Sequence, residues 1–290
     1  SSPASMIAAR TVIMMGSRPG KTVMVSDATA AYLQAKLDRV VWVTLPPLLR
    51  PKEWDDLGYD DPVVPLERAL YGHPESGRQW ELRCHQIMTD LGWQEVPQWR
   101  NVYRHTTLDV VCSVYVDDFL FGGSPEDINK VYGELSKRIE FSGVEVLHRY
   151  LGCNYTFRRT KGETVVKVEM KEFFESCVER YVNAVQDLAA KEGKSTTNWA
   201  DLLKMKQVST PFVDNEPGVA RTDLPSGALA PAASSILMKL LYGARLCRPD
   251  IAKAIGSLAS AVTRWTTEHD RSLHQLIKYV HSTLDHSLWM

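Results

Sequence analysis

Residues 108–123, Leu-Asp-Val-Val-Cys-Ser-Val-Tyr-Val-Asp-Asp-Phe-Leu-Phe-Gly-Gly, decide the fold class of this chain. Two adjacent carboxylates, Asp117 and Asp118, separate an apolar run from Val110 to Val116 from a second run, Phe119 to Phe121. These runs predict two strands joined by a tight turn. Because apolar flanks exclude water and counter-ions, two fixed negative charges at this turn repel each other unless a cation neutralises them. Oxygen ligands of this kind suit a hard divalent ion such as Mg²⁺.

Ordinary turn chemistry is a simpler interpretation of the Asp-Asp pair, since Asp favours tight turns and bonds to its own backbone. Turn chemistry does not explain a further aspartate at the end of another predicted strand. Residues 21–27, Lys-Thr-Val-Met-Val-Ser-Asp, form a short apolar run that ends in Asp27. The following residues, 28–37, predict a helical turn that carries Tyr32 five positions after the aspartate.

The composition is that of an ordinary globular protein. With 290 residues, 44% hydrophobic and 24% charged, the chain can bury a substantial core in one large or two small domains. The net charge of −1 is unexpected for a nucleic-acid-binding protein. The segment from residue 236 onward is net positive by three charges, and Arg158, Arg159 and Lys161 form a second basic cluster. Either cluster could contact phosphates or be a solvated surface.

Cysteine and histidine spacing argues against structural metal or disulfide chemistry. The five cysteines are odd in number and lack Cys-x-x-Cys spacing, and the eight histidines form no ligand pattern. We therefore expect a reducing compartment. No stretch has the length of a membrane span and no secretory leader opens the chain, so we expect an intracellular protein without membrane contact.

Apolar periodicity and turn residues predict the order of elements. Helices are expected at residues 5–15, 66–91, 125–140 (capped by Ser124) and 171–191, and a strand near 102–105. Residues 155–158 and 165–168 predict a hairpin, 211–231 a Pro- and Gly-rich linker, and the last 58 residues helix throughout. This mixture favours an α+β layer over a wound parallel sheet.

Several runs resemble, in order, the boxes of one enzyme family. Tyr115-Val-Asp-Asp118 matches the Tyr-x-Asp-Asp box of reverse transcriptases, and Asp27 with Tyr32 resembles the first catalytic box of their copia-type members. Further similar runs are Val41–Pro47, Arg68–Trp80 (the Leu-Tyr-Gly-x5-7-Trp box), Tyr150–Tyr155, Ser209–Phe212, Leu240–Gly243, Arg248–Ile251 and Leu276–Thr283. The chain thus resembles the reverse transcriptase domain of a copia-type LTR retrotransposon Pol polyprotein.

This resemblance implies a fold and an activity. The fold would be a right-hand polymerase palm, an antiparallel ferredoxin-like sheet packed on helices. Residues 1–160 would form the palm with partial fingers, and residues 161–290 a mainly helical thumb and connection. The activity would be RNA-directed DNA polymerisation with two Mg²⁺ ions, for which Mn²⁺ could substitute.

The resemblance also implies roles for individual residues. Asp27, Asp117 and Asp118 would be catalytic and would bind metal together with the backbone carbonyl of Ala28. The nucleotide site would comprise the steric gate Tyr32 with Tyr71, Gly72 and Tyr115; the primer grip Leu151, Gly152 and Cys153; and the contacts to nucleic-acid backbone Arg78, Arg245 and Arg248. Implied partners are an RNA template, a DNA or tRNA primer, the RNA–DNA hybrid, dNTPs, and the ribonuclease H and integrase segments of Pol. The expected location is a cytoplasmic virus-like particle or the nucleus.

Two departures from the family pattern keep an alternative open. Residues 73–79, His-Pro-Glu-Ser-Gly-Arg-Gln, place the acidic Glu75 where the family has an amide, beside a site for a triphosphate. The chain also begins after the segment that holds the family's basic finger strands, so we expect a Pol fragment or a diverged copy. The alternative is a catalytically inactive fragment or domesticated palm that binds nucleic acid or a partner protein. A metal-dependent nuclease is disfavoured, because cleavage needs neither the Tyr32 gate nor a primer grip.

Overall fold

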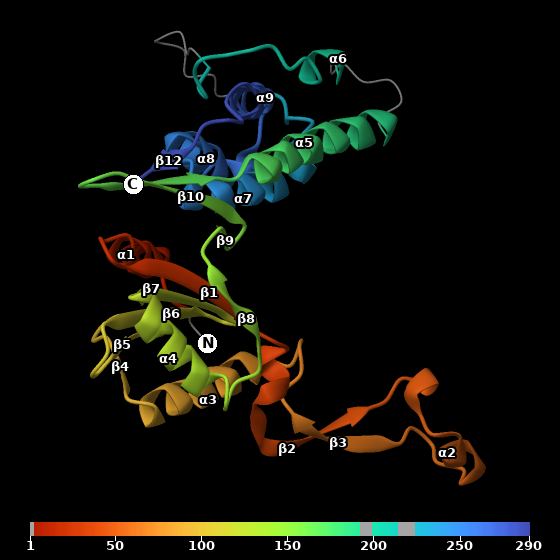
Figure 1. Cartoon of the computed structure of the whole chain (residues 1–290). Helices are drawn as coiled ribbons and strands as arrows, with labels where there is room; N and C mark the ends of the chain where they lie inside the picture. The colour runs from red at the N-terminus through yellow and green to blue at the C-terminus, as the bar shows by residue number, and fades with distance from the viewer. Residues whose placement is uncertain (1–2, 192–198, 214–223) are drawn as a thin grey trace. The chain divides into compact units, whose positions relative to one another are not determined.

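A computed structural model describes residues 3–191, 199–213 and 224–290, which form two compact units (Figure 1). The first unit runs to Leu147 and includes Lys161–Thr164, and the second comprises His148–Thr160 and Val165–Met290. Residues 148–160 therefore group with the second unit, whereas the sequence placed them in the first domain, residues 1–160. Each unit is described by itself below.

A six-stranded sheet forms the centre of the first unit (Figure 1). Every neighbouring pair of strands is antiparallel. The order across the sheet is β4 (Trp93–Glu95), β5 (Val102–His105), β6 (Val110–Tyr115), β7 (Asp118–Gly123), β1 (Thr22–Ala28) and β8 (Phe141–Val146). The predicted α+β class, with antiparallel strands packed on helices, is confirmed.

Successive side chains along β7 point to opposite faces of the sheet, and the two faces have different neighbours. Phe119 and Phe121 are buried in the core formed with helices α3 (Ser76–Asp90) and α4 (Pro125–Leu135). On the other face, helix α1 (Met6–Gly16) lies so close to the strand that a Cβ at Gly122 would be 2.6 Å from the Val12 carbonyl oxygen. Gly122 therefore permits this close packing of helix on sheet.

Helix positions in this unit agree with the sequence at some ends and differ at others. The Ser124 hydroxyl caps α4, as predicted, by accepting from the Asp127 N–H at 3.1 Å. The helix ends at Leu135 rather than at 140, with Ser136 as its C-cap, and the Ser136 hydroxyl donates to the Tyr132 carbonyl. Two short helices occur earlier in the unit, η2 (Pro47–Leu49) and α2 (Lys52–Asp56).

The helix predicted over 66–91 is wrong in its first ten residues. Strand β3 (Val63–Arg68) pairs with β2 (Lys36–Thr44), and the chain then turns through Gly72, at φ +94°, before α3 begins at Ser76. Strand pairing overrides the helical spacing of the apolar residues here. The helical turn predicted over 28–37 is reduced to the 3-10 helix η1 (Ala31–Gln34), since strands occupy both of its ends.

The second unit combines a small sheet with a group of helices (Figure 1). Helix α5 (Lys171–Lys191) has the predicted bounds, and α5, α7 and α9 bury Phe174, Leu240 and Ile277 between them. The sheet order is β12 (Leu288–Trp289), β11 (Thr164–Glu169), β10 (Cys153–Arg159) and β9 (Arg149–Tyr150); the other helices are α6 (Trp199–Leu202), α7 (Ala230–Leu246), η3 (Pro249–Ile251), α8 (Ala252–Ala259), η4 (Val262–Arg264) and α9 (Thr267–Ser282).

The predictions for the last 58 residues and for the linker 211–231 differ in outcome. The last 58 residues are not helical throughout, because Leu288 pairs with Val168 as strand β12. Of the predicted linker 211–231, residues 214–223 lie outside the described part, and the end of it already belongs to α7. Among the described residues, no helix is both long enough and apolar enough to cross a membrane.

Candidate active site

The turn between β6 and β7 carries the Asp-Asp pair. Tyr115 and Asp118 face each other across the hairpin, so that only Val116 and Asp117 form the turn. Val116 has φ +62°, a left-handed conformation that is rare for a β-branched residue. Its carbonyl oxygen accepts a hydrogen bond from the Trp80 indole N–H at 2.6 Å. The hairpin thus presents two successive carboxylates from a held turn.

Strand pairing brings the third carboxylate to the same place. Asp27 of β1 lies directly opposite Asp118 of β7, and opposed residues in an antiparallel pair have Cα atoms about 4.5 to 5.5 Å apart. The Ala28 N–H donates to the Asp117 carbonyl at 2.8 Å, which ties the end of β1 to the turn. Two segments 90 residues apart therefore place three aspartates at one end of the sheet.

Burial and mutual repulsion both disfavour the charged form of the carboxylates at this end of the sheet. Burial, and then the charges of Asp117 and Asp27, raise the pKa of Asp118 to about 6. Burial and Asp117 also raise the pKa of Asp27. A hard divalent cation would relieve this repulsion, and carboxylate oxygens are suitable ligands for one.

The carboxylates nevertheless do not enclose a preformed metal site. Across the described ranges, no three His, Cys, Asp or Glu side chains converge closely enough to hold a metal ion. This fits three like charges that avoid one another. Ala28, whose carbonyl the sequence proposed as a further ligand, is buried and opposes Phe141 of β8. The donor set therefore suits a divalent ion, and closing it would require the side chains to move inward.

Two tyrosines lie beside the aspartates. The rings of Tyr32 and Tyr71 pack with centroids 4.7 Å apart. Burial and the nearby charges of Asp117, Tyr32 and Asp27 raise the pKa of the Tyr71 phenol, against the effect of its hydrogen bond to the Tyr32 backbone. Gly72 follows in an open left-handed turn, where a side chain would meet no other atom. The residues proposed for the nucleotide thus gather near the carboxylates, with Tyr115 half-buried on β6.

Charged residues of the Arg68–Trp80 run have partners or surroundings that the sequence did not indicate. Glu75, which we expected to oppose a triphosphate, pairs with Arg39 of β2 at 3.0 Å. That ion pair offsets its negative charge. Arg78 is exposed and lines a surface hollow together with Glu81 and Arg100.

The residues proposed for the primer grip lie in the second unit, on the turn between β9 and β10. Leu151 and Gly152 have φ +48° and +77°, as a two-residue hairpin loop requires, and Cys153 pairs with Tyr150. The Tyr242 hydroxyl of α7 donates to the Leu151 carbonyl at 3.0 Å. The turn is therefore fixed to the helices of its own unit.

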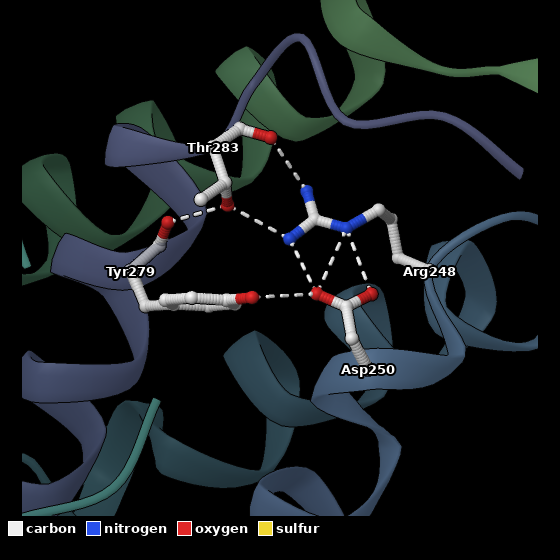
Figure 2. A network of polar contacts seen from close by, with 4 residues as sticks. All are labelled: Arg248, Asp250, Tyr279 and Thr283. Atoms are coloured by element: carbon white, nitrogen blue, oxygen red, sulfur yellow. Dashed lines mark hydrogen bonds and ion pairs between the residues drawn. The ribbon is translucent and has the colours of Figure 1, made fainter. Parts of the chain in front are cut away.

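Arg248 is not the phosphate contact that the sequence suggested. Its side chain is 2% exposed, and its guanidinium donates to both oxygens of Asp250 and to the carbonyl and hydroxyl of Thr283 (Figure 2). The Tyr279 hydroxyl donates to the same carboxylate at 3.1 Å. Each of the three guanidinium nitrogens donates inside the unit, so Arg248 has a structural role. Arg245, in contrast, lies on the exposed side of α7.

Sequence reasoning missed two residues of the candidate site. The Ser142 hydroxyl contacts the Asp27 carbonyl at 3.4 Å, and Trp80 binds the turn backbone. Position 80 closes the Leu-Tyr-Gly-x5-7-Trp run, so the sequence marked Trp80 as part of a box without indicating what it contacts.

Comparison with known proteins identifies the family. A sequence model described as "Reverse transcriptase (RNA-dependent DNA polymerase)" matches residues 2–187. The chain is 23% identical over 96% of its length to the Pol polyprotein from transposon TNT 1-94 of Nicotiana tabacum, of which it covers 20%. It is 23% identical over 91% of its length to the Pol polyprotein from transposon RE1 of Arabidopsis thaliana, of which it covers 16%.

A much shorter relative covers the same region. The chain is 22% identical over 89% of its length to the putative transposon Ty5-1 protein YCL074W of Saccharomyces cerevisiae, of which it covers 75%. The chain thus spans a fifth or less of the two plant Pol polyproteins and most of the yeast protein. The family match extends over more than half of the chain and includes all three aspartates. The chain therefore belongs to the reverse transcriptase family, and its relatives are the Pol polyproteins of copia-type retrotransposons.

Proposed function

We propose that the chain is an RNA-directed DNA polymerase, which adds nucleotides from dNTPs to a primer 3′-hydroxyl. The observation that carries the proposal is the pairing of Asp27 with Asp118 on neighbouring strands, directly beside Asp117 at the hairpin turn. A turn residue alone could be explained by turn chemistry. A third carboxylate supplied by a distant segment cannot, since it adds repulsion to the folded state.

Family members use divalent metal ions, and the three carboxylates fit a pair of Mg²⁺ ions, with Mn²⁺ as a substitute. When bound, such ions stabilise the attacking and leaving oxygens of phosphoryl transfer. In this proposal Asp27 and Asp117 would be the main metal ligands, with Asp118 and the Ala28 carbonyl as further ligands. Ligand binding then offsets the repulsion that raises the pKa of Asp118.

We propose roles for the neighbouring groups as well. Tyr32, which packs on Tyr71 near the carboxylates, would exclude a 2′-hydroxyl from the incoming sugar. Gly72 leaves room for a ligand at the backbone. In the proposed fold, the first unit is a palm with partial fingers and the second unit is a thumb and connection. The hairpin turn at Leu151, Gly152 and Cys153 is the proposed primer grip, and the exposed Arg78 and Arg245 are the proposed contacts to phosphates.

Partners follow from the activity and from the family. We propose an RNA template, a DNA or tRNA primer, their hybrid and dNTPs as substrates. The ribonuclease H and integrase segments of a Pol polyprotein are proposed as further partners, in a cytoplasmic virus-like particle or the nucleus.

Primer extension on an RNA template with Mg²⁺ tests the proposal. Asp117→Asn should lower the rate by at least roughly 100-fold, the usual loss when one group that stabilises transition-state charge is removed. Asp109→Asn is the matched control, because Asp109 is 71% exposed, pairs with Lys21 and lies just before strand β6 of the same hairpin. Equal rates for the Asp117 variant and the wild type would contradict the proposed mechanism.

Two observations favour a second function. The carboxylates do not converge on a metal position among the described residues, and the net charge of −1 is low for a polymerase. A non-catalytic protein that binds nucleic acid or a protein partner would share both features. Binding of a primed template without any extension, in Mg²⁺ or Mn²⁺, would favour this alternative.

A further inference from the structure

We propose that Trp80 is a positioning residue, whose indole N–H holds the Asp-Asp turn in the conformation that presents both carboxylates. The effect of Trp80 on catalysis rests on the proposed function, but its effect on the turn can be tested without activity.

The turn stores conformational strain at Val116. A left-handed φ of +62° is unfavourable for a β-branched residue, and such a residue keeps it only where the surroundings enforce it. Glycine is the usual residue at such positions in two-residue hairpin loops. The sequence supplies a valine instead, so contacts from outside the hairpin must stabilise the turn.

Two hydrogen bonds supply that enforcement, on successive carbonyls of the turn. The Trp80 indole N–H donates to the Val116 oxygen at 2.6 Å, and the Ala28 N–H donates to the Asp117 oxygen at 2.8 Å. One donor comes from helix α3 and the other from strand β1. The turn is therefore held from two separate elements, one of which also carries Asp27.

Trp80 is a rigid anchor. Its ring is 2% exposed and packs in the core of the first unit with Cys84 and Val114. A fixed indole can donate from one position only, so the bond determines where the Val116 carbonyl lies. Since an error of about 1 Å at a reacting centre can cost roughly 100-fold in rate, an anchor next to Asp117 affects catalysis without touching substrate.

Trp80→Phe removes the donor and keeps most of the ring. Trp93→Phe is the matched control, because Trp93 is equally buried in the same core but packs on His105 and Phe121 away from the turn. Both variants lose a similar amount of apolar contact. A purely structural role for Trp80 predicts that the two variants behave alike.

Amide hydrogen exchange of the peptide covering residues 114–121 is the first readout. Loss of one hydrogen bond worth about 0.5 to 1.5 kcal/mol should speed exchange in the turn roughly 2- to 10-fold in Trp80→Phe but not in Trp93→Phe. Equal exchange of this peptide in both variants would overturn the inference. This result does not depend on whether the chain polymerises DNA.

A double variant separates strain from general packing. Val116→Gly removes the steric cost of the left-handed turn. If Trp80 acts by enforcing that turn, Trp80→Phe should change exchange less in the glycine background than in the wild type. An equal effect in both backgrounds would show that Trp80 acts through the core alone and would contradict the proposal, even if Trp80→Phe is less stable.

Primer extension gives the functional consequence. With the wild type active, Trp80→Phe should lower the maximal rate and raise the Mg²⁺ concentration for half-maximal rate by roughly 3- to 10-fold each, with unchanged affinity for primed template. Unchanged rate and Mg²⁺ dependence would overturn the role of Trp80 while leaving the proposed polymerase intact. An inactive wild type would contradict the proposed function and leave the exchange experiment to decide the role of Trp80.

Discussion

Two clusters of this molecule contain partly buried aspartates, and they are built in opposite ways. At the end of the first unit's sheet, Asp27, Asp117 and Asp118 lie near one another on the backbone, and burial with like charge raises the pKa of Asp118 to about 6. In the second unit, burial would raise the pKa of Asp250, yet the hydrogen bonds and charge of Arg248 hold it below its usual value (Figure 2).

This difference distinguishes a structural cluster from the proposed functional one. Around Asp250, the carboxylate, the guanidinium and the hydroxyls of Thr283 and Tyr279 bond to one another, so the cluster contributes to folding. The three aspartates have excess negative charge that the fold itself does not compensate. A perturbed pKa caused by like charges and burial is a sign of a site that awaits a cation or substrate.

Removing the charge of Arg248 should produce the largest loss of stability. Arg248→Met leaves the Asp250 carboxylate without its cationic partner and the Thr283 carbonyl without its donor, and breaking a buried pair from one side costs about 3 kcal/mol or more. Urea denaturation followed by circular dichroism would show this as a lower midpoint.

Arg248→Lys sharpens the interpretation. Lysine keeps the charge but not the planar fork that reaches both Asp250 and Thr283. We expect an intermediate loss of stability. A lysine variant as stable as the wild type would show that charge alone, and not the hydrogen-bond geometry, holds this cluster.

The contrast also shows what the sequence could predict. The hairpin 108–123 was recognisable because a local pattern determined it: apolar runs, an acidic turn and a pair of glycines. Helix α5 was predicted to the residue for the same reason. The start of α3 was wrong because β3 depends on pairing with β2, which lies about 25 residues earlier.

Individual residue roles divide along the same line. That Asp27 meets Asp118 follows only from the register of β1 against β7, and resemblance to a family supplied what spacing could not. Arg248 was misassigned because basic charge in a sequence does not reveal burial. Trp80 was overlooked because its partner is a backbone carbonyl, which has no sequence signal.

The aspartate cluster should respond to pH in the direction opposite to that of an ordinary acidic group. Because the pKa of Asp118 is about 6 in the folded chain, above its ordinary value of 3.8, the folded state binds the proton more tightly than the unfolded chain does. Stability should therefore fall as pH rises from about 4 to about 6. Asp118→Asn should remove this fall and stabilise the chain at pH 7 by about 1 to 2 kcal/mol, allowing for solvent screening.

Urea denaturation of the wild type and Asp118→Asn at pH 4.5 and pH 7 would measure this. Millimolar Mg²⁺ should stabilise the wild type at pH 7, because a ligand that binds only the folded state raises its stability. The asparagine variant should gain less. If the difference in urea midpoint between the wild type and Asp118→Asn is the same at pH 4.5 and at pH 7, strong repulsion in the cluster is contradicted.

The smallest effect is expected for an ion pair with the same N···O distance as Arg248 and Asp250. Lys171 and Asp285 are also 2.8 Å apart, but their side chains are 51% and 85% exposed, against 2% and 36% for the buried pair. Lys171 lowers the pKa of Asp285, yet water and salt screen both charges and solvate each one when the other is removed. Asp285→Asn should therefore leave the urea midpoint unchanged within error, at low and high salt alike. A clear loss of stability would mean that distance, and not burial, determines what an ion pair contributes in this unit, and the contrast between the two aspartate clusters would then need another cause.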